Sequence, residues 1–182
     1  MALLALGIFL WWAAHLFKRV APERRAAMGD RGRGPVALGI AAGVILMIIG
    51  YRSAEVHDLW LAPDFFRHIN NLAILIAIYM MSPAPKKGVI LNGMRHPQLT
   101  GFTLWAAAHL LVNSDLASLL LFGGLAAWAI VEIIVINRAE PEWTRPQKGT
   151  IAKDAMFFAA SIVLMGVIGI IHGYLGPSPF PS

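Results

Sequence analysis

Long apolar stretches alternate with short polar segments along the whole chain. A transmembrane helix needs ~20 mostly apolar residues, and six stretches approach that length, at residues 2–17, 36–51, 63–82, 97–112, 116–137 and 154–175. The pattern shows no clear internal repeat and no linker long enough to separate two domains. It predicts an all-α, polytopic membrane helical bundle of six transmembrane helices, which forms a single domain over residues 1–182.

The composition supports a membrane protein. Of the 182 residues, 58% are hydrophobic and 14% are charged, whereas soluble domains carry ~45–50% apolar and ~25% charged residues. The chain has no cysteine, which excludes a disulfide scaffold and a thiolate metal site. The formal net charge is +5. Because the basic residues lie between the apolar stretches, we expect them to meet the anionic headgroups of a lipid bilayer and no nucleic acid.

The distribution of lysine and arginine predicts the orientation, because cytoplasmic loops of membrane proteins are enriched in both. Thirteen of the fifteen basic residues lie in the first, third and fifth loops, and only Arg52 and Arg67 lie on the other side. We therefore expect these three loops in the cytoplasm, both termini outside, and a multi-pass protein of the inner (plasma) membrane. Basic residues follow the first stretch, as Lys18 and Arg19, and none precedes its apolar part, so it is predicted to be a retained helix and not a cleaved signal peptide.

Ionisable side chains within the apolar stretches are the first candidates for function, because their burial in lipid is costly. His15 lies near the end of the first stretch, and His109 lies inside the fourth. Each has a structural alternative, an interfacial position for His15 and a hydrogen bond to a backbone carbonyl for His109. Glu132 lies in the fifth stretch, where antiparallel pairing with the fourth predicts an ion pair with Arg95 or His96, or a role in orienting a histidine.

Three further histidines lie outside or near the ends of the stretches. His57 belongs to an outer loop and is expected to be solvated. At 1.5 Å of rise per residue, His68, His109 and His172 each lie within one or two turns of the outer surface. Three histidines at one depth are a possible site for a metal ion or a haem.

The segment at residues 94–115, MRHPQLTGFTLWAAAHLLVNSD, is the most informative. Arg95 and His96 place two cationic donors before Pro97, which can open a helix whose N-terminus favours an anion. The segment resembles the signature of the NnrU family, in the pattern RHPQ…G…LWA…AHLL.N.D. The stretch WWAAHLF and the following APERR agree with the same family, and the resemblance covers nearly the whole chain.

The resemblance implies a role linked to denitrification, beside a nitrite or nitric oxide reductase or another membrane redox protein. The same pattern occurs in plant 15-cis-zeta-carotene isomerase, a membrane haem-b protein, in which histidines corresponding to His15 and His109 are implicated in axial ligation. The resemblance thus implies haem b in this chain, with His15 and His109 as iron ligands and His96 as a further cofactor-binding residue. The activity it implies is redox or isomerase-like.

Simple rise counting places the two implied ligands at different depths. His15 lies ~20 Å from the outer end of its helix and His109 only ~6 Å from the outer end of its own. Two ligands of one iron must approach to within ~4–5 Å of each other. By depth alone, His68 or His172 is the better partner for His109.

Two other functions are compatible with the residues. One is a cofactor-free membrane assembly or regulatory factor. The other rests on a second resemblance, because RHP followed by a small residue and glycine is similar to membrane methyltransferases of the isoprenylcysteine and phospholipid type, which bind S-adenosylmethionine. Those enzymes carry a downstream acidic pair, for which Glu140 and Glu142 stand here, split by a proline. Leu99 stands where they have an aromatic residue.

Overall fold

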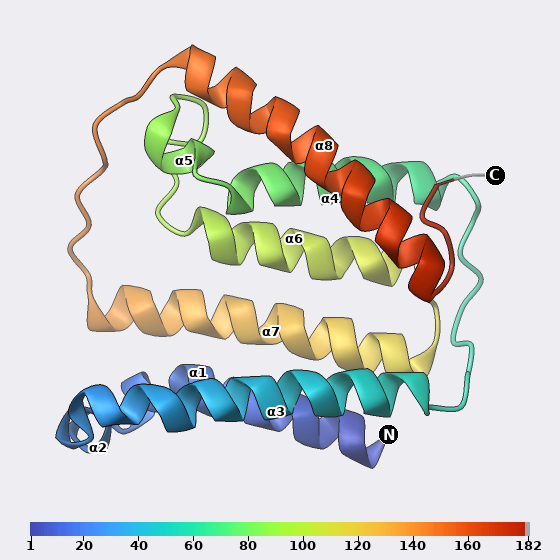
Figure 1. Cartoon of the computed structure of the whole chain (residues 1–182), viewed down its shortest axis with the longest axis horizontal. Helices are drawn as coiled ribbons and strands as arrows, with labels where there is room; N and C mark the ends of the chain where they lie inside the picture. Colours follow the sequence, from blue (N-terminus) through green and yellow to red (C-terminus); the bar gives the residue numbers. More distant parts are fainter. Residues whose placement is uncertain (181–182) are drawn as a thin grey trace.

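The computed structural model describes residues 1–180, which form helices joined by loops. Six long helices run back and forth along the long axis of the molecule (Figure 1). They are α1 (Ala2–Val20), α3 (Arg33–Arg52), α4 (Phe66–Met81), α6 (Pro97–Val112), α7 (Leu116–Ala139) and α8 (Ile151–Leu175). Three short elements lie in the connections: α2 (Pro22–Ala27), the 3-10 helix η1 (Gly29–Gly32) and α5 (Ala84–Lys87).

Each predicted apolar stretch is a helix, and the boundaries agree to within three residues. Four helices, α1, α3, α7 and α8, are long and apolar enough to cross a membrane. The other two, α4 and α6, have 16 residues each. At 1.5 Å per residue that is about 24 Å, which is less than the ~30 Å of a bilayer core. The all-helical, membrane-type architecture is confirmed. That the chain crosses the membrane six times stays a prediction.

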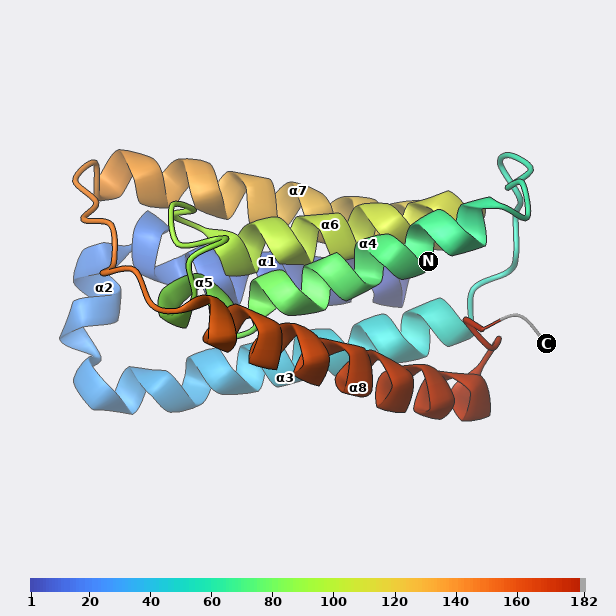
Figure 2. The same cartoon turned by 90° about the horizontal axis from the view of Figure 1, so that it is seen from above.

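Helix packing divides the bundle into two groups. Helix α1 packs along α3, and α4 packs along α6, while contact between α6 and α7 joins the groups (Figures 1 and 2). A core of five buried apolar side chains lies where α1, α3 and α7 meet: Leu4, Ile8, Met47, Ala117 and Leu125. Helix α8 lies against α4 and α5 and exposes most of its large apolar side chains. Such an exposed apolar surface is what contact with lipid requires.

The two ends of the bundle carry different charges. Figure 1 shows α2, α5 and the α7–α8 connection at one end, and the α3–α4 loop, the α6–α7 turn, the N-terminus and the end of α8 at the other. The basic residues of the first, third and fifth loops belong to the first end, whereas Arg52 and Arg67 belong to the second. The separation of charge expected from the sequence is therefore present, and we refer to the first end as the basic end.

The loops at the basic end interlock. Asn92, between α5 and α6, is fully buried. Its amide donates to the carbonyls of Pro146 and Gln147 at 3.2 and 3.3 Å, and its oxygen accepts from Arg145 Nε at 2.9 Å. All three partners belong to the α7–α8 connection. The third and fifth loops thus form one cap, which the buried Asp154 of α8 also contacts.

Cysteine labelling tests the predicted orientation directly, because the natural chain has no cysteine. Leu61 in the α3–α4 loop is 94% exposed, and Arg24 of α2 is exposed at the basic end. In intact cells stripped of any outer wall, a membrane-impermeant maleimide is expected to label Leu61→Cys and leave Arg24→Cys unlabelled. Both variants should react after the membrane is opened. Labelling of Arg24→Cys alone in intact cells would reverse the orientation.

Candidate functional site: two tryptophan-backed histidines

His15 lies on the face of α1 that meets α7. Its Nδ1 is 2.8 Å from the carbonyl oxygen of Trp11, one turn earlier. Its ring centroid lies 4.2 Å from that of Trp11 and 4.7 Å from that of Trp128 on α7. Because a carbonyl only accepts hydrogen bonds, Nδ1 carries the proton of the neutral ring, and Nε2 is left with a lone pair. In this tautomer Nε2 can act as a metal ligand.

Three residues near His15 carry a buried polar atom without a partner. Among the described residues, the indole nitrogens of Trp11 and Trp128 and one carboxylate oxygen of Glu132 are buried and form no hydrogen bond. Trp128 and Glu132 lie one turn apart on α7, and Glu132 is near enough to His15 and Arg19 for their charges to act on it. Buried polar atoms are nearly always hydrogen-bonded in proteins. Two indole donors and one carboxylate oxygen near the contact of α1 with α7 thus have no partner among the described residues.

The predicted pairing of Glu132 with Arg95 or His96 is wrong. His96 Nε2 lies 2.8 Å from the side-chain oxygen of Asn137, five residues beyond Glu132. The backbones of Asn113 and Asp115 are extended, so the chain advances further along the bundle before α7 begins. This shifts the pairing of α6 and α7 by more than one turn. Glu132 instead lies near His15 and Arg19 of α1. The alternative, in which Glu132 orients a histidine, stays a prediction.

At the basic end, Arg95 and Glu140 form hydrogen bonds and an ion pair with other parts of the chain. Arg95 donates to the backbone carbonyls of Glu140 and Pro141. The carboxylate of Glu140 is 2.9 Å from Arg19, and its hydrogen bond with Arg19 holds the pKa of that carboxyl below its ordinary value. Arg95 and Glu140, two of the residues that the methyltransferase resemblance would use, are thus both bound to other parts of the chain.

His109 is held in the same way as His15. Its Nδ1 is 2.8 Å from the carbonyl oxygen of Trp105, one turn earlier on α6. Its ring centroid lies 4.7 Å from that of Trp105 and 4.5 Å from that of Phe122 on α7. His172 of α8 is near enough for its charge to act on His109. Here too the proton lies on Nδ1, and Nε2 carries the lone pair.

Aromatic rings separate the two histidines. Phe102 on α6 lies between them, with its ring centroid 6.2 Å from Trp11, 5.4 Å from Trp128 and 5.1 Å from Trp105. His15 and His109 therefore stand at the two ends of one row of packed rings, and the structure does not bring them together. A single iron held by both would have to occupy volume that these rings fill.

Comparison with known proteins assigns the chain to a family. Residues 3–179 match the family described as NnrU protein. The chain belongs to the NnrU family. The match extends over all six long helices and so includes both histidine sites. No curated protein and no solved structure matches this NnrU chain significantly.

The remaining histidines of the NnrU chain lie apart from these sites or at the surface. His68 is exposed at the start of α4. His172 is exposed, with Nδ1 2.8 Å from the carbonyl of Pro177. His57 is exposed beside Glu55, as expected for a loop residue. Within residues 1–180, no three His, Asp or Glu side chains gather closely enough to hold a metal ion.

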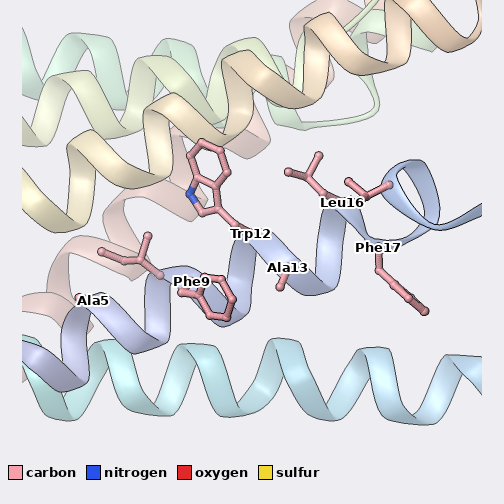
Figure 3. A pocket seen from close by; sticks show the side chains of 8 residues that line it. Ala5, Phe9, Trp12, Ala13, Leu16 and Phe17 are labelled. Atoms are coloured by element: carbon pink, nitrogen blue, oxygen red, sulfur yellow. The ribbon is translucent and has the colours of Figure 1, made fainter.

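An apolar groove runs along another face of α1 (Figure 3). Its volume is ≈ 590 Å³. Its lining residues all belong to α1 and are apolar: Ala5, Ile8, Phe9, Trp12, Ala13, Leu16, Phe17 and Val20. Trp12 closes one side, where its indole nitrogen donates to the carbonyl of Gly124 on α7 at 3.0 Å. His15 is not among the lining residues, so the groove is a surface separate from the histidine sites.

The sequence interpretation identified both histidines but missed the rings that hold them. The indole nitrogen of Trp11 is buried in the bundle. The missed signal is the spacing W-x-x-x-H, which occurs at Trp11 and His15 and again at Trp105 and His109. Residues four apart on a helix share one face, so this spacing predicts both ring contacts.

Proposed function

We propose that this NnrU protein is a multi-pass protein of the inner membrane that binds haem b and serves nitrogen-oxide reduction. The observation that supports the proposal is the state of two partly buried histidines, His15 and His109. In both, Nδ1 is bonded to a carbonyl one turn earlier and Nε2 carries the lone pair. Imidazole in this tautomer, inside a helical bundle, is a suitable axial ligand for haem iron. Bound haem supplies one-electron redox chemistry and affinity for nitric oxide.

The residues around each histidine suit the role of holding a ligand. The carbonyls of Trp11 and Trp105 fix the tautomer and the ring orientation of His15 and His109, as second-shell carbonyls do for metal-bound imidazoles. The indole rings of Trp11 and Trp105 pack directly against the two imidazoles. His96, which the family resemblance also implicates in cofactor binding, lies at the basic end and bonds to Asn137. Any part it has in cofactor binding would therefore be at that end of the bundle.

An absorption spectrum tests the proposal. Protein purified from cells with adequate haem supply is expected to show a Soret band, and His109→Ala should reduce that band by at least half, because the imidazole ligand is lost. His57→Ala is the matched control, since His57 is exposed and lies in a loop. A colourless natural protein that also fails to bind added hemin would overturn the proposal.

A second candidate is a cofactor-free assembly factor for a membrane reductase, and the apolar groove on α1 favours it. The groove has the apolar lining that a helix of another membrane protein would need. This candidate predicts a colourless chain that co-purifies with its partner. Ala13→Trp, which fills the groove, should abolish co-purification, whereas Ala107→Trp on α6, outside the groove, should leave it intact. Haem binding unaffected by the loss of a partner would favour the first function.

A further inference from the structure

The start of α8 is fastened to α5 by a close junction of two backbone segments. The backbone nitrogen of Gly149 donates to the Gly88 carbonyl at 3.0 Å, and that of Thr150 donates to the Lys87 carbonyl at 3.3 Å. Both glycines permit this approach, because a Cβ on Gly88 would collide with the Asp154 carboxylate and one on Gly149 with the Lys87 carbonyl. The junction thus brings the end of α5 and the first turn of α8 together at the basic end (Figures 1 and 2).

A pocket of ≈ 380 Å³ lies beside this junction. Its lining residues come from α4, the α5–α6 loop and the first turns of α8: Tyr79, Ile90, Ile151, Asp154, Ala155 and Phe158. Asp154 is the one charged member, but it is only 2% exposed and its carboxylate accepts hydrogen bonds from the Tyr79 hydroxyl and two backbone nitrogens. Phe158 lies seven residues after Ile151, which is about 10 Å further along α8. The pocket is therefore mainly apolar and runs inward from the basic end.

Four lysines lie in the two segments that form the junction: Lys86, Lys87, Lys148 and Lys153. All four are exposed, and none forms an ion pair within residues 1–180. The buried Asp154 is the only acidic residue within five positions of any of them along the chain. The outer end of the apolar pocket therefore has a basic rim whose charge is not balanced locally.

We propose that this pocket binds one anionic phospholipid from the bilayer leaflet at the basic end. An acyl chain lies along Ala155 and Phe158, and the headgroup phosphate meets the lysines of the rim. The occupant follows from charge complementarity, because an anionic head on an apolar chain matches a basic rim over an apolar pocket. The lipid also covers Ile90 and Ile151, which are each 63% exposed. Bound in this way, it links α4, the α5–α6 loop and α8.

Native mass spectrometry of the full-length protein in detergent tests the site. With equal amounts of phosphatidylglycerol and phosphatidylcholine of the same acyl chains, one phosphatidylglycerol is expected to stay bound under activation that removes phosphatidylcholine. The triple variant Lys87→Gln, Lys148→Gln, Lys153→Gln should bind phosphatidylglycerol about tenfold more weakly or worse, because each lysine near an anionic headgroup contributes about fivefold. Ala155→Trp, which places an indole in the pocket, should lose the lipid although it keeps all four lysines.

The matched control removes the same charge from the first loop, as Lys18→Gln, Arg24→Gln, Arg31→Gln, three exposed residues at the basic end; it should keep the lipid. Glycerol phosphate, which has the phosphate but no acyl chain, should not displace the lipid. Far-ultraviolet circular dichroism verifies folding, and Ala155→Leu replaces Ala155→Trp if the latter does not fold. Equal retention of both lipids, equal loss in the two triple variants, or retention with the pocket filled would overturn the proposal.

Discussion

Asp154→Ala is expected to lower the free energy of unfolding by about 3–5 kcal/mol. Asp154 lies in the first turn of α8 and is only 2% exposed. Its carboxylate accepts hydrogen bonds from the Tyr79 hydroxyl at 2.6 Å, the Val89 backbone nitrogen at 2.6 Å and the Ile90 backbone nitrogen at 3.3 Å. Removal of the carboxylate leaves three donors without an acceptor, in a site too buried for water to replace it freely.

Two comparisons separate the contributions. Tyr79→Phe removes one of the three hydrogen bonds and should cost only about 1–2 kcal/mol. Asp64→Ala, at an exposed position before α4, should leave stability unchanged. Unfolding by denaturant in detergent micelles, followed by far-ultraviolet circular dichroism, measures all three. If Asp154→Ala were no more destabilising than Tyr79→Phe, the bonds to Val89 and Ile90 would contribute nothing to the cap.

Most of the fold could be predicted from the sequence, because the apolar stretches that become helices are the same ones that lipid or the core must cover. Pro97 marks the start of α6 as expected for a first-turn proline, and Asp115 caps α7 by accepting from the Ser118 nitrogen at 2.9 Å. Which helices pack against which could not be predicted. Lipid-facing and helix-facing apolar residues have the same chemistry, so nothing in α8 indicates that it packs on α4 and α5.

The candidate site could be predicted only in part. His15 and His109 stand out because ionisable residues in apolar stretches are costly. Their separation also agrees with rise counting, which places them at different depths. The predicted pairing of Glu132 was wrong. It depends on the extended backbone at Asn113 and Asp115, because a change of a few dihedral angles there moves α7 along α6 by about a turn. The contacts of Phe102 with rings from three helices depend on tertiary packing and have no local sequence signal.

Gly50→Ala is expected to destabilise the protein by about 3 kcal/mol through the packing of α1 on α3. A Cβ on Gly50 would come within 2.7 Å of the Leu4 Cα and would also meet the Leu4 backbone nitrogen. These are backbone atoms, so no side-chain rotation relieves the contact, and α1 must move away from α3. Because Leu4 is fully buried in the core beside α7, that movement also loosens the helix that carries His15.

The matched control for this substitution lies on the same helix. A Cβ on Gly39, in the interior of α3, would meet only the Cβ of Ala14, at an ordinary contact distance of 3.5 Å, so Gly39→Ala should raise stability by about 0.5–1 kcal/mol through the lower conformational entropy of its unfolded chain. Both are measured by the midpoint of thermal unfolding in detergent. If the two variants shifted the midpoint equally, the close approach of α1 and α3 would not contribute to stability.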